Sequence, residues 1–131
     1  MAIIINNLPH PVNIISKDNI RFDASIRKWV ADEGTEPIRT LPPSGNVLNA
    51  KIDTFEVDPI EDEDDIPCFE KSIEGCDPLP DDGCIHIVSA LYASAAAKAG
   101  YDMSRIRLTA DPVMTPDGKK FVGCRGLVKH F

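Results

Sequence analysis

The sequence predicts an α+β fold in which a small, mostly antiparallel sheet carries one clear helix at about residues 90–99. Two observations favour this class. The 131 residues include 11 prolines and 8 glycines, which are typical of many turns and short elements and not of a helical bundle. Apolar runs are short and bounded by turn residues, as strands are, and only the stretch after Ser89 is rich in alanine. The length fits a single domain over residues 1–131.

The N-terminal third is predicted to be mainly extended. Residues 2–15 hold two short apolar runs on either side of "NNLPHP", where two prolines hold His10 in a rigid, extended segment. Asp23 is a favourable cap for a short helix at residues 24–31. This part therefore contributes two strands, or one kinked strand, and one short helix.

Two further strands are predicted in "IRTLPPSGNVLNAKIDTFEV", paired through a plain hairpin turn at residues 42–45. The run "EVDPIEDEDD" at residues 56–65 follows as an acidic surface loop with seven acids and no base. Another strand is predicted in "IPCFEKSIEG", and the proline-rich and aspartate-rich "CDPLPDDG" after it is a turn.

The clearest local signal is a strand that runs directly into a helix. Residues 84–88 are apolar on both faces, which is typical of a central, covered strand. Ser89 is a favourable N-cap, and Gly100 stands where a helix often ends in a left-handed residue. His86 points to the opposite face from Ser89, so we expect a hydrogen-bonded histidine within the sheet. The tail is predicted to form two or three strands, with a hairpin turn at residues 116–118.

Charge is distributed unevenly along the chain. The net charge is −7, but outside residues 56–65 there are 14 acids and 14 bases, and residues 98–131 carry a net charge of +4. This polarity favours a small anion at the basic segment or a protein at the acidic loop, and it disfavours double-stranded DNA as a partner. The apolar run at residues 2–5 is too short for a signal peptide or a membrane span, which predicts a cytoplasmic protein without a membrane partner.

The residues that usually carry catalysis or bind metals are not grouped in this sequence. The four cysteines are spaced by eight, eight and forty residues and lack the close pairs of a zinc site, so we expect free thiols, no metal and no cofactor. Neither a carboxylate pair nor a nucleophile–base pair can be assembled from the sequence. The sequence therefore leans towards a protein that is not an enzyme.

Five residues are candidates for binding a small anionic ligand, and a sixth follows from the resemblance given below. His10 is rigidly held, and Arg125 is flanked by glycines that permit the close approach of a ligand or of another backbone. Ser44 and Gly45 could present backbone amides, although a plain turn explains them more simply. Ser89 lies at a helix N-terminus, which favours anions, but the junction lacks the glycines of phosphate-binding loops, and capping is the preferred interpretation.

Four phrases occur in the order "NLPHPVNI", "LPPSGNV", "LPDDGCIHIVSALYASAA" and "PDGKKFVGCRGL". Together they resemble a group of small uncharacterised phage and bacterial proteins that carry Leu-Thr-Pro-His, Pro-Ser-Gly, Tyr-Ile-Val-Ser and Gly-Cys-Arg-Gly-Leu phrases. This chain departs from that pattern, because Asn7-Leu8-Pro9-His10 lacks the threonine of the first phrase and His86 stands where tyrosine is usual. Lys51 lies near the position of the family's arginine and is the sixth candidate. The resemblance implies a phage-type origin and carries no settled activity.

Two functions are compatible with the sequence. The first is a non-enzymatic protein that binds a small anionic ligand such as a nucleotide, and that sequesters a nucleotide signal of host defence. The second is a structural or protein-interaction module, such as an accessory virion or host-takeover protein, that acts through the acidic loop at residues 56–65. In either case, a small sheet with open edges favours a homo-oligomer.

Overall fold

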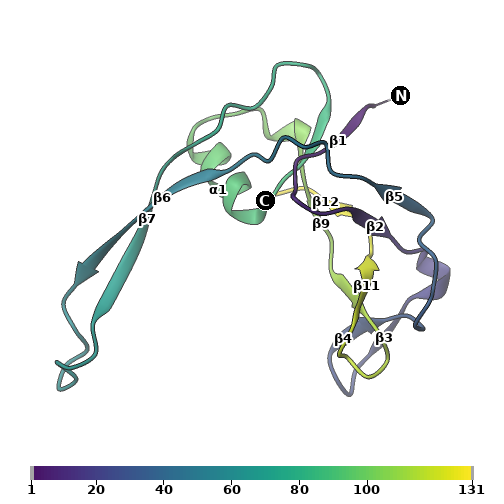
Figure 1. The fold of residues 1–131 in the computed structure, drawn as a ribbon, viewed down its shortest axis with the longest axis horizontal. Helices are drawn as coiled ribbons and strands as arrows, with labels where there is room; N and C mark the ends of the chain where they lie inside the picture. The colour runs from purple at the N-terminus through teal and green to yellow at the C-terminus, as the bar shows by residue number, and fades with distance from the viewer. Residues whose placement is uncertain (1, 131) are drawn as a thin grey trace.

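One α-helix and three β-sheets make up the computed structural model, which describes residues 2–130 (Figure 1). The predicted α+β class with one helix is confirmed. Among the strand pairs of the described residues, five are antiparallel and four are parallel, so the sheets are mixed and antiparallel pairing predominates only narrowly. Two short 3-10 helices complete the fold, η1 (Lys17–Asn19) and η2 (Met103–Arg105).

The first sheet contains β1 (Ile4–Asn6), β8 (Ile85–Ile87), β9 (Ile106–Thr109) and β12 (Leu127–Val128), in that order. β8 pairs in parallel with both β1 and β9, which confirms the prediction that this apolar strand is central. The chain leaves β8 and enters α1 (Ala90–Lys98), which confirms the predicted helix. A hydrophobic cluster holds the helix on the sheet, and its buried members are Leu48, Val88, Tyr92, Ala93, Ala96 and Ile106.

The second sheet has the order β3-β4-β10-β11-β2-β5. Its strands are β3 (Arg21–Asp23), β4 (Lys28–Val30), β10 (Pro112–Met114), β11 (Phe121–Cys124), β2 (Val12–Ile14) and β5 (Arg39–Leu41). The predicted hairpin turn at residues 116–118 joins β10 and β11. A buried cluster at the junction of the two sheets ties them together, and it consists of Leu8, Val12, Leu41, Ile87 and Cys124.

The predicted helix at residues 24–31 is wrong, because β3 and β4 form an antiparallel hairpin there. Phe22 and Trp29 lie opposite each other in this hairpin and their rings meet edge to face, with centroids 5.2 Å apart. Such a cross-strand aromatic pair, together with the pairing of β4 with β10, outweighs a helix of two turns that would have little intrinsic stability.

The third sheet is a long hairpin of β6 (Ala50–Val57) and β7 (Cys68–Cys76). Both strands were expected, but the predicted pairing of the strands on either side of residues 42–45 is wrong, since β5 pairs with β2 and β6 pairs with β7. The reason is non-local: Asn6 accepts the Ser44 N–H at 2.9 Å and donates to the Leu41 carbonyl at 3.0 Å, which holds β5 and the following turn on the body. The chain then departs from the body along β6.

Candidate functional site

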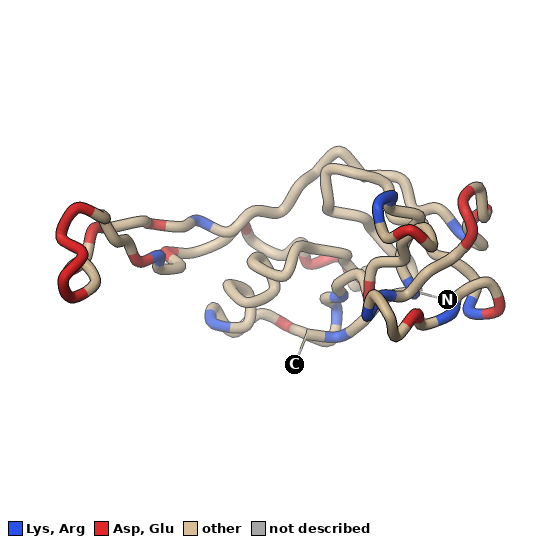
Figure 2. The backbone as a smooth tube through the Cα atoms, turned by 90° about the horizontal axis from the view of Figure 1, so that it is seen from below, with Lys and Arg blue, Asp and Glu red and all other residues tan. Residues whose placement is uncertain are grey.

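The β6–β7 hairpin extends away from the rest of the molecule, and we call it the arm (Figure 1). Its strands pair from Ala50–Cys76 at the root to Val57–Cys68 near the end. Residues 58–67 close the arm, and we call them the tip. Acidic residues cluster along the backbone of the tip, remote from the body (Figure 2). They are Asp58, Glu61, Asp62, Glu63, Asp64 and Asp65.

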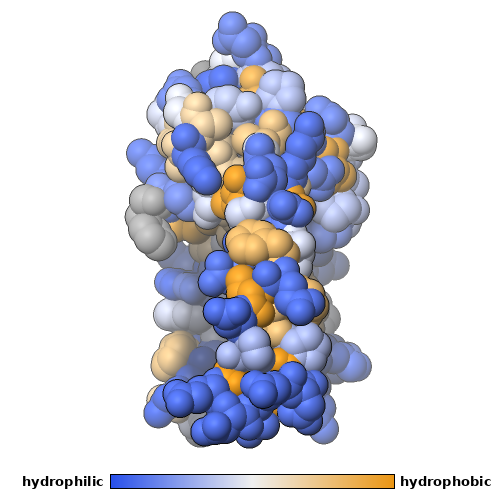
Figure 3. Space-filling model, turned by 90° about the vertical axis from the view of Figure 1, so that its left-hand side faces the viewer, coloured by the Kyte–Doolittle hydropathy of each residue, from blue (hydrophilic) through white to orange (hydrophobic). Residues whose placement is uncertain are grey.

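Large apolar side chains are exposed along the arm. The exposed fractions are 43% for Phe55, 56% for Phe69, 62% for Ile60 and 47% for Ile66. Seen from the end of the arm, apolar patches alternate with hydrophilic residues along its surface (Figure 3). A two-stranded sheet is marginally stable by itself, and exposed large apolar side chains on such a hairpin are typical of an interaction site.

The strand register assigns each side chain of the arm to one of two faces. Opposed residues share a face and successive pairs alternate, so the pairs Ile52–Ile73, Thr54–Lys71 and Glu56–Phe69 lie on one face. On this face a hollow of about 570 Å³ separates the arm from Leu91 of α1 and is lined by Ile52, Thr54, Lys71, Ser72, Ile73 and Leu91. The opposite face carries the pairs Asp53–Ser72, Phe55–Glu70 and Val57–Cys68.

Three residues anchor the root of the arm to the body. Asp77 and Asn49 are joined by two hydrogen bonds. The Asp77 N–H donates to the Asn49 carbonyl at 2.9 Å, and the Asn49 N–H donates to Asp77 Oδ2 at 2.8 Å. The buried Tyr92 hydroxyl donates to the Asp77 carbonyl at 2.8 Å. Because Tyr92 belongs to the core cluster under α1, the direction of the arm is set by the packed body.

The predicted ligand residues are distributed over several places. Ser89 caps α1, because its Oγ accepts the Tyr92 N–H at 3.1 Å, and the preferred capping interpretation is confirmed. Lys51 is exposed at the root of the arm. Ser44 and Gly45 lie in the turn after β5, where Ser44 Oγ accepts the Asn46 N–H at 3.3 Å and Gly45 has a φ of +89°.

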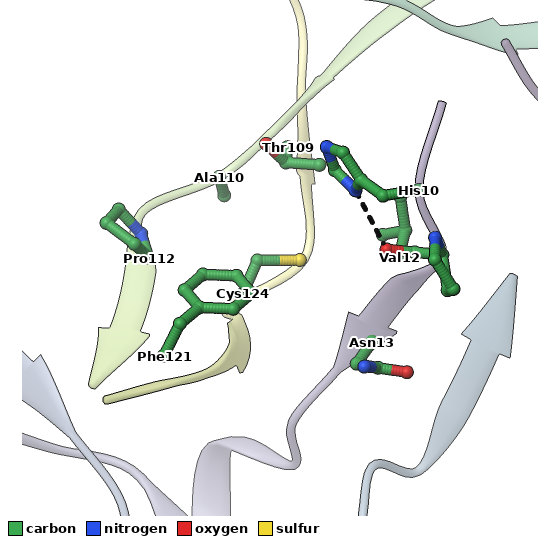
Figure 4. A pocket seen from close by; sticks show the side chains of 9 residues that line it. His10, Val12, Asn13, Thr109, Ala110, Pro112, Phe121 and Cys124 are labelled. Carbon is green, nitrogen blue, oxygen red and sulfur yellow. Dashed lines mark hydrogen bonds between the residues drawn. The ribbon is translucent and has the colours of Figure 1, made fainter. Parts of the chain in front are cut away.

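His10 lines a small hollow of about 100 Å³ between the ends of β2 and β9 (Figure 4). Its Nδ1 donates to the Pro11 carbonyl at 3.0 Å, so the ring is held by the neighbouring backbone. Thr109 lies beside the ring, and the Phe121 and Cys124 side chains face it from the other side (Figure 4). The hollow is mainly apolar and smaller than the 300–1,000 Å³ of most ligand sites.

Arg125 lies in a second hollow, of about 410 Å³, together with Lys17 and Trp29. Its guanidinium lies 3.7 Å from the centre of the Trp29 ring, and its Nη1 donates to Asp111 Oδ2 at 2.9 Å. Arg125 therefore forms an ion pair with Asp111 at the edge of this hollow. The hollows of Arg125 and His10 adjoin at Ala110 but are distinct.

A polar network that the sequence did not reveal crosses the first sheet. His86 is 1% exposed, and its Nδ1 lies 2.6 Å from Asn7 Oδ1 while its Nε2 lies 3.0 Å from Asp82 Oδ1. Arg105 Nη1 also reaches Asp82, at 3.3 Å. Asn7 donates to the Asn46 carbonyl at 2.7 Å and so links the network to the turn before the arm. The expectation of a hydrogen-bonded His86 within the sheet is confirmed, and the network holds its strand in place.

The network predicts a specific loss of stability in acid. Hydrogen bonds from His86 and from the Cys84 N–H lower the pKa of Asp82 from 3.8 to about 2. A lowered pKa in the folded state means that the carboxylate stabilises the fold fully above pH 3.8, and that this contribution is lost as the pH falls towards about 2. In urea unfolding at a series of pH values, the free energy of unfolding of Asp82→Asn should fall less steeply than that of the wild type as the pH decreases below 3.8. Asp81→Asn, a change at an exposed neighbour, is the control and should follow the wild type; parallel curves for Asp82→Asn and the wild type would contradict the assignment.

The remaining chemistry of the described residues is sparse. All four cysteines are free thiols, as expected, with Cys84 and Cys124 buried. Burial raises the pKa of both buried thiols, which disfavours the reactive thiolate. Within residues 2–130, no group of three or more His, Cys, Asp or Glu side chains could hold a metal ion. The α-helix found in the same region is too short to cross a membrane.

The chain was compared with protein families, curated proteins and solved structures. No family model matches it, and no curated protein or solved structure does either. Its function is therefore inferred from its own residues.

Proposed function

We propose that this protein is a non-enzymatic interaction module that contacts a partner protein through the arm. The observation that supports this most directly is the exposure of Phe55, Phe69, Ile60 and Ile66 on a hairpin that extends from the body. Aromatic residues are enriched in protein interfaces, and a two-stranded hairpin has no core of its own in which Phe55 and Phe69 could be buried. The phage-type setting and cytoplasmic location that the sequence suggested remain part of this proposal.

The acidic tip suits this role in two ways. Its charges keep an apolar arm soluble and discourage strand pairing with unrelated proteins. They also accelerate the encounter with a surface of opposite charge, because such steering acts over about a Debye length. A partner surface with a basic rim and an apolar centre would therefore complement the arm.

A shortened arm tests this function without disturbing the fold. Thr54 pairs with Lys71, so replacing residues 55–70 by Asn-Gly closes the hairpin with a two-residue turn. None of the removed residues belongs to a core cluster, so the free energy of unfolding should change by no more than about 0.5 kcal/mol. The shortened protein should lose its partner in co-purification from the cells that naturally contain it.

Direct contact can be measured with a photo-crosslinking phenylalanine analogue. We expect adducts with another polypeptide when the analogue replaces Phe69, and none when it replaces Phe121. Phe121 is a matched control, since it is 63% exposed but lies on β11 in the body. Equal labelling at the two positions, or a shortened arm that keeps the partner, would refute the role of the arm.

A second candidate function, binding of a small anionic ligand, is favoured by one observation. Two cations, Lys17 and Arg125, line a single hollow whose volume is within the usual range for ligand sites. Arg125 presents five N–H donors, and the bond to Asp111 uses only part of this set. The Trp29 ring supplies an aromatic wall.

Thermal unfolding against mononucleotides, cyclic nucleotides and phosphate tests this candidate. A ligand present at about 100 times its dissociation constant should stabilise the fold by about 2.7 kcal/mol. The effect should disappear in Arg125→Ala and persist in Lys119→Ala, which removes one exposed charge elsewhere. A panel without any shift, or a shift that survives Arg125→Ala, would exclude the hollow as an anion site.

A further inference from the structure

We propose that the hollow of Arg125 and the hollow next to it form one site, and that this site binds a nucleoside with phosphates on both its 3′ and its 5′ oxygens. This unit occurs in a free nucleoside bisphosphate and at every internal position of a single-stranded nucleic acid. The inference rests on the second candidate function, because it names the ligand class of the hollow that holds Arg125. It does not involve the arm.

The two hollows share a wall. Trp29 and Asp111 line the hollow of Arg125, which has a volume of about 410 Å³. The same two residues line a second hollow of about 370 Å³, to which Arg27 also belongs. Each volume is within the range of small-molecule sites. A molecule that lies across Trp29 and Asp111 therefore reaches both hollows.

Each hollow carries a pair of cations. Lys17 and Arg125 belong to the first hollow, and Arg27 and Lys28 belong to the second. Asp111 is the one acid among the described residues that line either hollow, although the whole chain has a net charge of −7. Apart from Arg125, none of these cations takes part in an ion pair within residues 2–130. Two separate pairs of cations favour a ligand with two phosphates over a ligand with one.

The wall between the cation pairs suits a sugar and a base. The Arg125 guanidinium lies 3.7 Å from the centre of the Trp29 ring, and Phe22, which is 51% exposed, meets the same ring edge to face. Bases stack on aromatic rings and on guanidinium planes. Asp111 uses Oδ2 to accept from Arg125, and a carboxylate has further acceptor positions for a sugar hydroxyl or a base amino group. The surface therefore offers sites for phosphate, nucleoside and phosphate in succession.

The backbone of Arg27 supports a role for this side chain in binding. Its φ of +54° lies in the left-handed region, where glycine is favoured over other residues. Arg27 is the last residue of the turn between β3 and β4, so glycine would form this turn with less strain. Strained residues of this kind cluster at ligand-binding positions. The cation that Arg27 supplies to the second hollow is a contribution that glycine could not make.

Fluorescence titration of the full chain tests the inference. Trp29 is the single tryptophan and lines both hollows, so its emission reports on this site. We expect adenosine 3′,5′-bisphosphate to bind about tenfold more tightly than adenosine 5′-monophosphate or adenosine 3′-monophosphate, because the second phosphate gains a charge-assisted contact. A bisphosphate that binds no more tightly than the monophosphates would overturn the inference.

Arg27→Gly separates binding from stability. It relieves the left-handed strain, so the midpoint of its thermal unfolding should be no lower than that of the wild type. The same change should weaken binding of the bisphosphate by about tenfold. Arg39→Ala is the control, since it removes an exposed cation from β5 at the opposite edge of the second sheet, and it should bind as the wild type does. Wild-type affinity in Arg27→Gly, or an equal loss in Arg39→Ala, would refute the shared site.

A single-stranded heptanucleotide distinguishes the two sources of this ligand chemistry. An affinity equal to or above that of the bisphosphate would identify the ligand as a nucleic acid strand, and a lower affinity would identify it as a free nucleotide. The two proposals also fail differently. A monophosphate that binds through Arg125 without any gain from a second phosphate refutes only this inference. No response to any of these ligands refutes the second candidate function as well.

Discussion

Tyr92→Ala is expected to lower the free energy of unfolding by about 3–5 kcal/mol, because a completely buried aromatic ring would be replaced by a cavity. The ring packs with Val88 and Ile106 between α1 and the first sheet. Urea unfolding measures the loss directly. A change of less than about 1 kcal/mol would mean that the helix does not depend on this ring.

Tyr92→Phe separates packing from the hydrogen bond. It keeps the ring but removes the donor to the Asp77 carbonyl, which should cost about 1 kcal/mol. Because Asp77 and Asn49 together form the root of the arm, their amide hydrogens should exchange faster in this variant than in the wild type. Unchanged exchange at both amides would show that the arm is anchored elsewhere.

The same residue predicts the behaviour of the protein in base. Burial raises the pKa of Tyr92 from 10.0 to about 12, since the phenolate is disfavoured in the core. A raised pKa in the folded state means that this contribution to stability is complete below pH 10.0 and is lost as the pH rises towards about 12. Between pH 10 and about 12, the free energy of unfolding of Tyr92→Phe should therefore decrease less than that of the wild type. An identical decrease in the variant and the wild type would contradict this prediction.

Gly123→Ala is expected to lower the free energy of unfolding by about 2–3 kcal/mol, as overpacking does in a close-packed sheet. A methyl group at this position would lie 2.6 Å from the Asn13 carbonyl oxygen and 2.9 Å from the Ile15 side chain. The backbone of β2 would have to move away from β11, which would disturb the Ile15 N–H bond to the Cys124 carbonyl. The same movement would widen the hollow beside His10.

Gly45→Ala is the control for this change. Gly45 has a φ of +89° and no atom within 4 Å of a built methyl group, so alanine there adds only backbone strain, about 1–2 kcal/mol. Thermal or urea unfolding of the two variants should place Gly123→Ala below Gly45→Ala in stability. The reverse order would show that the close approach of β2 and β11 is relaxed without cost.

Local signals predicted the helix, its cap at Ser89, the turn at residues 116–118 and the central strand at residues 84–88. Each depends on residues within a few positions of one another, such as the Ser89 hydroxyl and the Tyr92 amide. The glycines beside Arg125 were expected to permit the close approach of a ligand or of another backbone, and at Gly123 the structure shows the close approach of the β2 backbone. Arg125 was singled out because glycines flank it. Its contact with Trp29 could not be predicted, because the two residues are 96 positions apart in the chain.

The sequence by itself determined the helix, the turns and the acidic character of residues 56–65, because bonds and charges between near neighbours encode these features. The tertiary structure alone decided which strands pair, since strands of three residues, such as β1 and β8, carry almost no register information and depend on burial for their partners. It also decided that the acidic segment ends a projecting arm, one face of which carries Phe69 and Lys71 and borders a hollow beside Leu91. These groups share a surface only after the core of the body has fixed the root of the arm.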